Sequence, residues 1–464
     1  MRAPLFLVML LAGGVPAWSA ETALDRYVAA PDASYKYNLV QTLPGTGYTT
    51  YVLDMTSQTW RSPAEVNRPE WRHWLTVIKP DQVKHSTGFL FITGGSNQNK
   101  RPAQPPANLT SMAVDTGTVV AELRMVPNQP LIFAGESAGR TEDSLIAYTW
   151  DKFLRGGDEN WPARLPMTKS AVRAMDTVTS FCASDQAGKA KVDRFVVAGA
   201  SKRGWTTWAT AAVDKRVAAI IPMVIDLLNV EPSFQHHWRA YGFWAPAIDD
   251  YADLKIMDWM GSREYPKLLA IEDPFSYRER FTMPKYIVNA SGDQFFLPDS
   301  SQFYFDDLKG EKYLRYVPNA DHSMRGTDAA ENVQAFYESF LQGGSRPKIA
   351  WEMRKDGSIQ VKASGQPVAV KLWQATNPKA RDFRLDTIGP AWKDTELKPL
   401  KAGEWSAKVR KPSSGWTAFF VELTYPGVGK HPLKFTTAVR VIPDTLPFPP
   451  YVPDLKVRGA GSQP

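Results

Sequence analysis

Short apolar runs rich in β-branched residues alternate with longer amphipathic segments between about residues 40 and 345. Helical stretches such as Ala329–Leu341 separate these runs. A parallel sheet with crossover helices requires this alternation, so residues 21–345 are predicted to form a doubly wound α/β sheet. The runs predicted as buried strands are Gly88–Thr93, Gly117–Leu123, Val192–Ala198, Ala218–Ile225, Pro284–Asn289 and Lys312–Val317.

The hydrophobic period changes to two after residue 345. Ile349–Arg354 and Ser358–Ala363 flank the turn signal Lys355-Asp356-Gly357, and apolar residues alternate with polar ones over Leu433–Val441. Short strands with glycine- and proline-rich turns are typical of a sandwich. Residues 346–464 are therefore predicted as an Ig-like β-sandwich whose proline-rich tail, from Pro443 on, is extended or loose.

The N-terminus has the composition of an export signal. Arg2 precedes the apolar run Leu5–Ala12, and small residues follow as far as Ala20, which predicts a signal peptide over residues 1–20. No later stretch approaches the roughly 18 consecutive apolar residues of a spanning helix. We therefore expect an exported protein, periplasmic or secreted, without stable membrane insertion.

Composition narrows the class of protein. Of the 464 residues 43% are hydrophobic and 22% charged, which excludes a disordered chain or a coiled coil. The single cysteine, Cys182, excludes a disulfide framework and a cysteine metal cluster. The net charge is +7, but the basic residues are interspersed with acidic ones, so no nucleic-acid partner is expected.

One motif indicates a nucleophile. Gly199-Ala-Ser-Lys-Arg-Gly204 lies where a predicted strand gives way to the helical run Trp205–Val213. A serine on such a turn, here Ser201, projects its hydroxyl from the carboxyl edge of the sheet. The usual G-x-S-x-G pattern has glycine where this chain has Arg203, and a helix N-cap is the alternative role of the serine.

The partners of a nucleophilic serine follow in the chain order of an α/β-hydrolase, acid before histidine. Asp293 follows the strand that ends at Asn289, and His322 follows the next strand. We predict a Ser201–His322–Asp293 triad in which His322 takes the serine proton and Asp293 orients the imidazole. Asp226 is a competing acid, and Asp321 is expected to form a turn.

Other residues are candidates for binding the substrate. Backbone N–H groups of Gly95 and of Lys202 are predicted to form the oxyanion hole. An aromatic-rich insertion over about residues 227–282 is expected to cap the site, although its aromatic residues can equally form its own core. Adjacent helical residues such as His236 and His237 point about 100° apart, so no metal site is expected, and no organic cofactor is needed. The tentative substrate-binding residues are Arg203, His237, Trp238 and Trp244.

The sequence resembles the PhoPQ-activated pathogenicity-related protein family of the α/β-hydrolase superfamily. The resemblance implies a secreted two-domain protein with esterase-like hydrolysis. A second similarity, to glucuronoyl esterases, implies that Lys202 occupies the position of an oxyanion-supporting arginine. The similar stretches are Leu53–Arg61, Pro69–Leu75, Val126–Pro130, Arg140–Trp150 and Gly199–Trp205.

Four residues of the family motifs, Trp60, His73, Glu142 and Asp143, are interpreted as structural, with Arg140 paired to one of the two carboxylates. Together these features predict an exported serine hydrolase that acts on a small-molecule or glycan-linked carboxylic ester through an acyl-enzyme. The alternatives are a serine peptidase of the same fold and a catalytically silent binding or signalling protein.

Overall fold

The computed structural model describes residues 21–458, so the predicted signal peptide lies outside the described residues. The strands are β1 Lys36–Gly45, β2 Tyr48–Thr59, β3 Glu70–Pro80, β4 Thr87–Ile92, β5 Val120–Leu123, β6 Arg194–Ala200, β7 Val217–Met223, β8 Lys285–Ala290, β9 Lys312–Val317, β10 Ile349–Met353, β11 Ile359–Ala363, β12 Ala369–Asn377, β13 Lys393–Glu396, β14 Glu404–Ala407, β15 Trp416–Tyr425, β16 Leu433–Thr436 and β17 Arg440–Ile442. The helices are α1 Ala23–Ala29, α2 Ala107–Thr116, α3 Glu142–Gly156, α4 Arg164–Cys182, α5 Lys202–Val213, α6 Val230–Tyr241, α7 Asp249–Asp253, α8 Tyr265–Glu272, α9 Ala329–Gln342 and α10 Leu385–Ile388. None of the helices described is long and apolar enough to cross a membrane.

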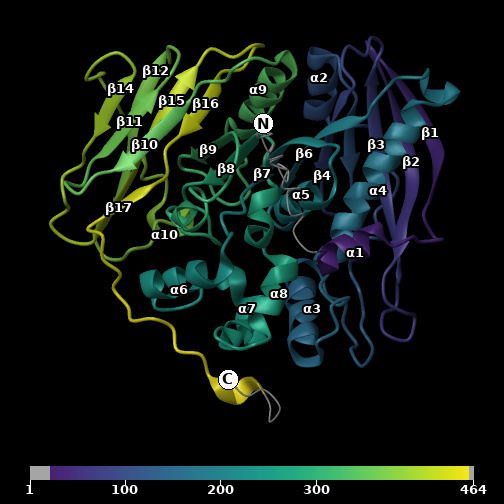
Figure 1. Cartoon of the computed structure of the whole chain (residues 1–464), viewed down its shortest axis with the longest axis horizontal. Coiled ribbons are helices and arrows are strands. Elements are labelled where there is room, and N and C mark those ends of the chain that lie inside the picture. The colour runs from purple at the N-terminus through teal and green to yellow at the C-terminus, as the bar shows by residue number, and fades with distance from the viewer. Residues whose placement is uncertain (1–20, 459–464) are drawn as a thin grey trace, which may run out of the picture.

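One large sheet crosses the molecule, in the order β1-β2-β3-β5-β4-β6-β7-β8-β9-β16-β15-β12-β13 (Figure 1). Neighbours from β5 to β9 are parallel, whereas β1, β2 and β3 are antiparallel. Every residue of β7 and β8 is buried, as expected for parallel strands covered on both faces. Helices α4 and α5 pack in one core cluster and α2 and α9 in another. The predicted doubly wound α/β sheet is confirmed.

A cap is inserted between β7 and β8. It contains α6, α7, α8 and short 3-10 turns, and Figure 1 shows these helices gathered beside α3 at one side of the sheet. Several cap aromatics, among them Trp259 and Tyr265, are fully buried. These cap aromatics belong to the same hydrophobic core as α4 and α5, so the cap packs into the main domain.

The C-terminal strands form a sandwich that is joined to the main sheet. A smaller sheet, β10-β11-β14, accompanies the strands β12, β13, β15 and β16. Strand β16 pairs with β9, where Thr436 lies opposite Leu314. An unpaired edge strand exposes a row of backbone donors and acceptors, and β16 covers that edge of β9. The main sheet thus continues across residue 345, the domain boundary predicted from the sequence.

The tail is extended, but the prediction that it is loose is wrong for the described part. The backbone N–H of Phe448 donates to the carbonyl of Arg239 on α6. Gln235 and Tyr451 exchange two hydrogen bonds, of 3.0 and 3.2 Å, and the Tyr451 hydroxyl donates to Asp258 at 2.6 Å. The segment, yellow in Figure 1, therefore leaves the sandwich and fastens onto the cap.

Candidate active site

Ser201 occupies a sharp turn between β6 and α5. Its φ of 58° and ψ of −128° lie in a region that non-glycine residues rarely adopt. The flanking glycines allow the strand and the helix to approach. A Cβ on Gly199 would lie 2.6 Å from the Arg203 carbonyl oxygen, and one on Gly204 would lie 2.8 Å from Ile225 Cγ2. This is the geometry of a nucleophile elbow.

His322 and Asp293 lie at the carboxyl ends of β9 and β8. Nδ1 of His322 lies 3.0 and 2.9 Å from the two carboxylate oxygens of Asp293. An ionised carboxylate can only accept, so Nδ1 is assigned as the donor of this hydrogen bond. The backbone N–H of His322 donates to Gln294, and that of Phe295 donates to Asp293, which fixes both loops.

The competing acids have other partners. Asp226 is buried and accepts hydrogen bonds from the hydroxyls of Tyr304 and Tyr316, each at 2.6 Å. Burial raises its pKa to about 7 despite these two bonds. The Asp321 carboxylate accepts from the backbone N–H and the hydroxyl of Ser323, as expected for a turn former. Asp293 is the carboxylate that contacts His322.

A cavity of about 40 Å³ lies beside the elbow. Two of its walls, Phe295 and Phe296, also contact the His322 imidazole, at centroid distances of 4.2 and 6.1 Å. The serine and the histidine therefore share one aromatic wall. The lining residues are Asp143, Trp150, Arg164, Ser201, Lys202, Trp205, Ile225, Leu227, Phe234, Ile248, Tyr251, Phe295 and Phe296.

The side chain of Lys202 is held by the start of α3. Its Nζ lies 2.8 Å from Glu142 and 3.0 Å from Asp143, which also accepts a hydrogen bond from Tyr251. Burial alone would raise the pKa of Glu142, but its ion pairs with Arg203 and Lys202 hold that pKa well below its usual range. The ammonium of Lys202 is thus compensated within the site.

Arg203 is placed differently from the sequence interpretation. Its guanidinium donates to both oxygens of Glu142 at 2.7 Å and to the Val126 carbonyl at 2.5 Å, and it packs under Gly94. It is absent from the cavity lining, and its hydrogen bonds join the loop after β5 and the start of α3 to the elbow. Its contact with the substrate stays a prediction. Arg140, expected to pair with Glu142 or Asp143, pairs instead with Glu136.

The two predicted oxyanion donors lie in suitable local structures. Lys202 is the first residue of α5, and the first N–H groups of a helix have no partner within it. Gly95, which lies in the loop shortly after β4, has a φ of 125°, a value that favours glycine. Asn99 accepts a hydrogen bond from the N–H of Ser96 at 2.6 Å and braces this loop.

The cap residues proposed for substrate binding fall into two groups. His237 lines a small recess that shares five residues with the serine cavity, and its Nε2 accepts from the Ala245 N–H at 3.0 Å. Burial lowers its pKa to about 3, so it is neutral. Trp238 and Trp244 line a separate cavity with Tyr451 and are absent from the lining of the serine cavity, and their place at the substrate stays a prediction.

The adjacent histidines do not share a ligand. His236 Nε2 lies 3.1 Å from Asp299, which is also bonded to Arg381, whereas His237 faces Ala245. Within residues 21–458 no group of three or more His, Cys, Asp or Glu side chains is arranged to hold a metal ion.

Sequence reasoning missed most of the cavity wall. Trp150 is buried and also lines the cavity. Asp143, which the sequence indicates as a structural residue, and Arg164 line it too, because their place depends on how α3 and α4 pack. Phe295 and Phe296 directly follow the Asp293 loop, and that adjacency was the one signal available for the aromatic wall.

A family model described as PhoPQ-activated pathogenicity-related protein matches residues 24–384. The Autocrine proliferation repressor protein A of Dictyostelium discoideum is 39% identical to this chain over an alignment of 474 residues, gaps included. The alignment covers 95% of this chain and 94% of that protein.

Among solved structures, similar chains include three esterases. Acetyl xylan esterase 1 from a Thermoanaerobacterium species has 16% identity and a TM-score of 0.47, covering 69% of this chain and 92% of its own. An acetyl xylan esterase from a Paenibacillus species has 15% identity and a TM-score of 0.49, covering 68% and 91%. A glucuronoyl esterase from Solibacter usitatus has 14% identity and a TM-score of 0.38, covering 69% and 91%.

Proposed function

The chain belongs to the PhoPQ-activated pathogenicity-related protein family, and from the geometry around Ser201 we propose that it is an exported serine hydrolase that cleaves a carboxylic ester. One observation carries the proposal. Ser201 stands on a strained, glycine-flanked turn, in a cavity whose phenyl walls also contact an imidazole that is bonded to Asp293. A structural serine has no need of this arrangement.

In the proposed reaction, Nε2 of His322 accepts the proton of Ser201 as the serine oxygen attacks the ester carbonyl. Asp293 stabilises the imidazolium through Nδ1–H. The N–H groups of Gly95 and Lys202 stabilise the oxyanion, and loss of one such donor typically lowers kcat by roughly 10²–10³. His322 then protonates the leaving alcohol, and water hydrolyses the acyl-enzyme by the same steps.

The size of the cavity supports a short acyl group. Its volume of about 40 Å³ is only a few times the roughly 10–15 Å³ that a cavity needs in order to hold one water molecule. An acetyl-sized group suits that space, and the aromatic lining suits its methyl end. The alcohol part, a small molecule or a glycan, extends out of the cavity.

The proposal is tested by labelling with a fluorophosphonate and by assays of nitrophenyl esters. We expect labelling of the wild type, no labelling of Ser201→Ala, and faster turnover of the acetate than of the octanoate. Cleavage of an aminoacyl anilide without cleavage of any nitrophenyl ester would indicate a peptidase instead. A folded wild type that neither labels nor turns over any of these substrates refutes the proposal.

A signalling role is the second candidate. The observation that favours it is the relative with 39% identity along 95% of this chain, which is named as an autocrine proliferation repressor. If the wild-type protein and Ser201→Ala repress proliferation of a responsive cell equally, the effect does not require catalysis. Loss of repression in Ser201→Ala would join the two proposals into one.

Export remains part of the proposal because of the charged and apolar composition of residues 1–20. We expect the mature protein, periplasmic or secreted, to begin within or just after residues 18–20. Cell fractionation followed by sequencing of the mature N-terminus tests this. An intact N-terminus on protein that is found only in the cytoplasm contradicts it.

A further inference from the structure

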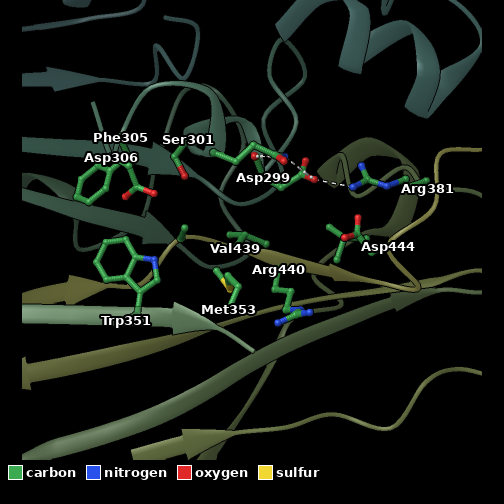
Figure 2. A pocket seen from close by; sticks show the side chains of 13 residues that line it. Asp299, Ser301, Phe305, Asp306, Trp351, Met353, Arg381, Val439, Arg440 and Asp444 are labelled. Atoms are coloured by element: carbon green, nitrogen blue, oxygen red, sulfur yellow. Dashed lines mark hydrogen bonds and ion pairs between the residues drawn. The ribbon is translucent and has the colours of Figure 1, made fainter. Parts of the chain in front are cut away.

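A second cavity, of about 260 Å³, lies between the main sheet and the C-terminal sandwich (Figure 2). We call it the interdomain cavity. One side is the segment Asp299–Asp306, and the other comes from β10, β17 and the residues next to β17. None of its lining residues lines the Ser201 cavity, so it is a separate site.

Its innermost polar group is the Arg381 guanidinium. Arg381 is 3% exposed and donates to Asp299 at 2.5 Å, and His236 contacts the same carboxylate. The buried Nε–H of Arg381 has no hydrogen-bond partner within the described part of the chain. A buried donor without a partner costs roughly 1–3 kcal/mol, so an acceptor that reaches this N–H from the cavity would remove that cost.

Trp351 forms one wall. Its indole stacks on the Phe305 ring, with centroids 5.0 Å apart, so Phe305 covers one face. Figure 2 shows the indole nitrogen on the ring edge nearer Met353 and Val439. No hydrogen bond of this N–H is found to any residue between 21 and 458. Met353 and Val439 add an aliphatic surface beside this second donor.

Two carboxylates stand on the outer parts of the lining. Asp306 and Asp444 are exposed, and neither side chain has an ion pair or hydrogen bond among the described residues. Arg440 is held by the carbonyls of Arg354 and Ser358. The lining thus has three aspartates against two arginines, an excess of one negative charge, which disfavours anionic ligands.

We propose that the interdomain cavity binds a neutral saccharide. The N–H groups of Arg381 and Trp351 have no acceptor within the described chain, the exposed carboxylates of Asp306 and Asp444 can accept, and a sugar hydroxyl both donates and accepts. The C–H face of a pyranose ring matches the aliphatic surface of Met353 and Val439. An amine would leave the two N–H donors unpaired, and an anion would face the excess acidic charge.

The volume agrees with a short ligand. Pockets for drug-sized molecules typically span about 300–1,000 Å³, so this cavity suits one or two sugar rings, with any longer chain running past Asp306 or Asp444 into solvent. This proposal goes beyond ester hydrolysis and does not depend on whether Ser201 is a nucleophile.

The experiment is calorimetric titration of the full-length protein carrying Ser201→Ala, which prevents turnover. The ligands are xylotetraose, cellotetraose and mannotetraose, with trigalacturonic acid as the anionic probe. We expect at least one neutral tetrasaccharide to bind with a Kd of millimolar or lower, and the anionic probe to bind more weakly.

Two substitutions in the same background locate the binding. Trp351→Phe keeps an aromatic ring against Phe305 and removes the indole N–H together with part of the ring area, and Asp444→Ala removes an exposed acceptor. Each is expected to weaken binding about tenfold, equivalent to about 1.4 kcal/mol. The matched control is Trp373→Phe, because Trp373 also has an indole N–H without a partner in the described chain but lies outside the cavity. It should bind as the parent does.

Absence of binding by all three neutral tetrasaccharides at millimolar concentration overturns the proposal. So does binding that is unchanged in both Trp351→Phe and Asp444→Ala while circular dichroism shows intact folds. Fluorophosphonate labelling and ester turnover are measured separately in the Trp351→Phe variant with Ser201 present. A failure of the proposed esterase activity is therefore distinguished from a failure of saccharide binding.

Discussion

Ser201 is held in a backbone conformation that costs a non-glycine residue on the order of 1–3 kcal/mol. The surrounding packing maintains it: Gly199 and Gly204 let α5 lie close to β6, and the Ser201 N–H donates to the carbonyl of Met223 at 2.8 Å. Strain of this kind concentrates at functional sites. Of the two candidate acids, Asp293 is the one that contacts His322, whereas Asp226 is enclosed by two tyrosines.

The two acids are distinguished by matched substitutions. Asp293→Asn should lower kcat for nitrophenyl acetate by about 10⁴, because the amide no longer holds the imidazole in the required tautomer. Asp226→Asn should leave kcat within a few-fold of the wild type. Steady-state kinetics on both variants, with circular dichroism as the check of folding, measures this. The reverse ranking would assign the catalytic acid to Asp226.

His237 makes the stability dependent on pH. Its folded pKa of about 3 lies below the ordinary value of 6.5, so between these values the unfolded chain binds a proton that the folded chain does not. Stability from this group is present above pH 6.5 and is lost as the pH falls toward 3, at about 1.4 kcal/mol per pH unit. His237→Gln keeps an acceptor for Ala245 and should reduce that slope by about one proton.

Urea titrations at a series of pH values measure the slope. His73, which is also buried with a pKa lowered to about 4, remains in the variant and preserves part of the acid sensitivity. Equal slopes in the wild type and His237→Gln would contradict a neutral, buried His237.

Helix α5 positions the elbow through its first turn. Lys202 and Arg203 both reach Glu142 at the start of α3, where a carboxylate also interacts favourably with the helix dipole. These ion pairs join the elbow to α3, and both border the serine cavity. The cap is fixed from its other side by the tail, through Tyr451 and Phe448.

The tail contacts predict a local effect of truncation. Ending the chain after Ile442 removes the bonds to Gln235 and Asp258, and hydrogen exchange in α6 should become faster, because local opening costs less free energy. Helix α9, which the tail does not contact in the described structure, is the internal control. Mass spectrometry of the exchanged peptides compares the two helices. Unchanged exchange in α6 would mean that the tail is not required to hold the cap.

The junction between the sandwich and the main sheet is buried. Arg315 on β9 donates to Glu422 on β15 at 2.5 Å and to Asp328 at 2.9 Å, and its side chain is 1% exposed. The Tyr286 hydroxyl donates to the carbonyl of Lys434 across the same boundary. With β16 paired to β9, unfolding either part exposes both an edge strand and an unpaired charge.

Replacement of Arg315 should therefore destabilise the whole molecule. Arg315→Met leaves Glu422 buried without its partner, and the expected loss is about 3–5 kcal/mol in the free energy of unfolding. The control is Lys408→Ala, which removes an exposed pair with Asp356 and should leave the free energy of unfolding close to that of the wild type. Calorimetry measures both and should find a single transition in the wild type. Two separate transitions, with only one shifted by Arg315→Met, would show that the parts unfold independently.

Local sequence pattern predicts the alternation of strands and helices, the glycine-flanked turn of Ser201, and the positions of Asp293 and His322 after successive strands. Periodicity and turn chemistry act between residues that are close along the chain, so they can be recognised in the sequence. The folded chain was needed to show that Arg203 bonds to Glu142, that Trp238 and Trp244 line a cavity away from Ser201, that β16 pairs with β9, and that the tail returns to the cap. Each of these depends on which distant segments meet in space, and many partners of equal chemical suitability are present along the chain.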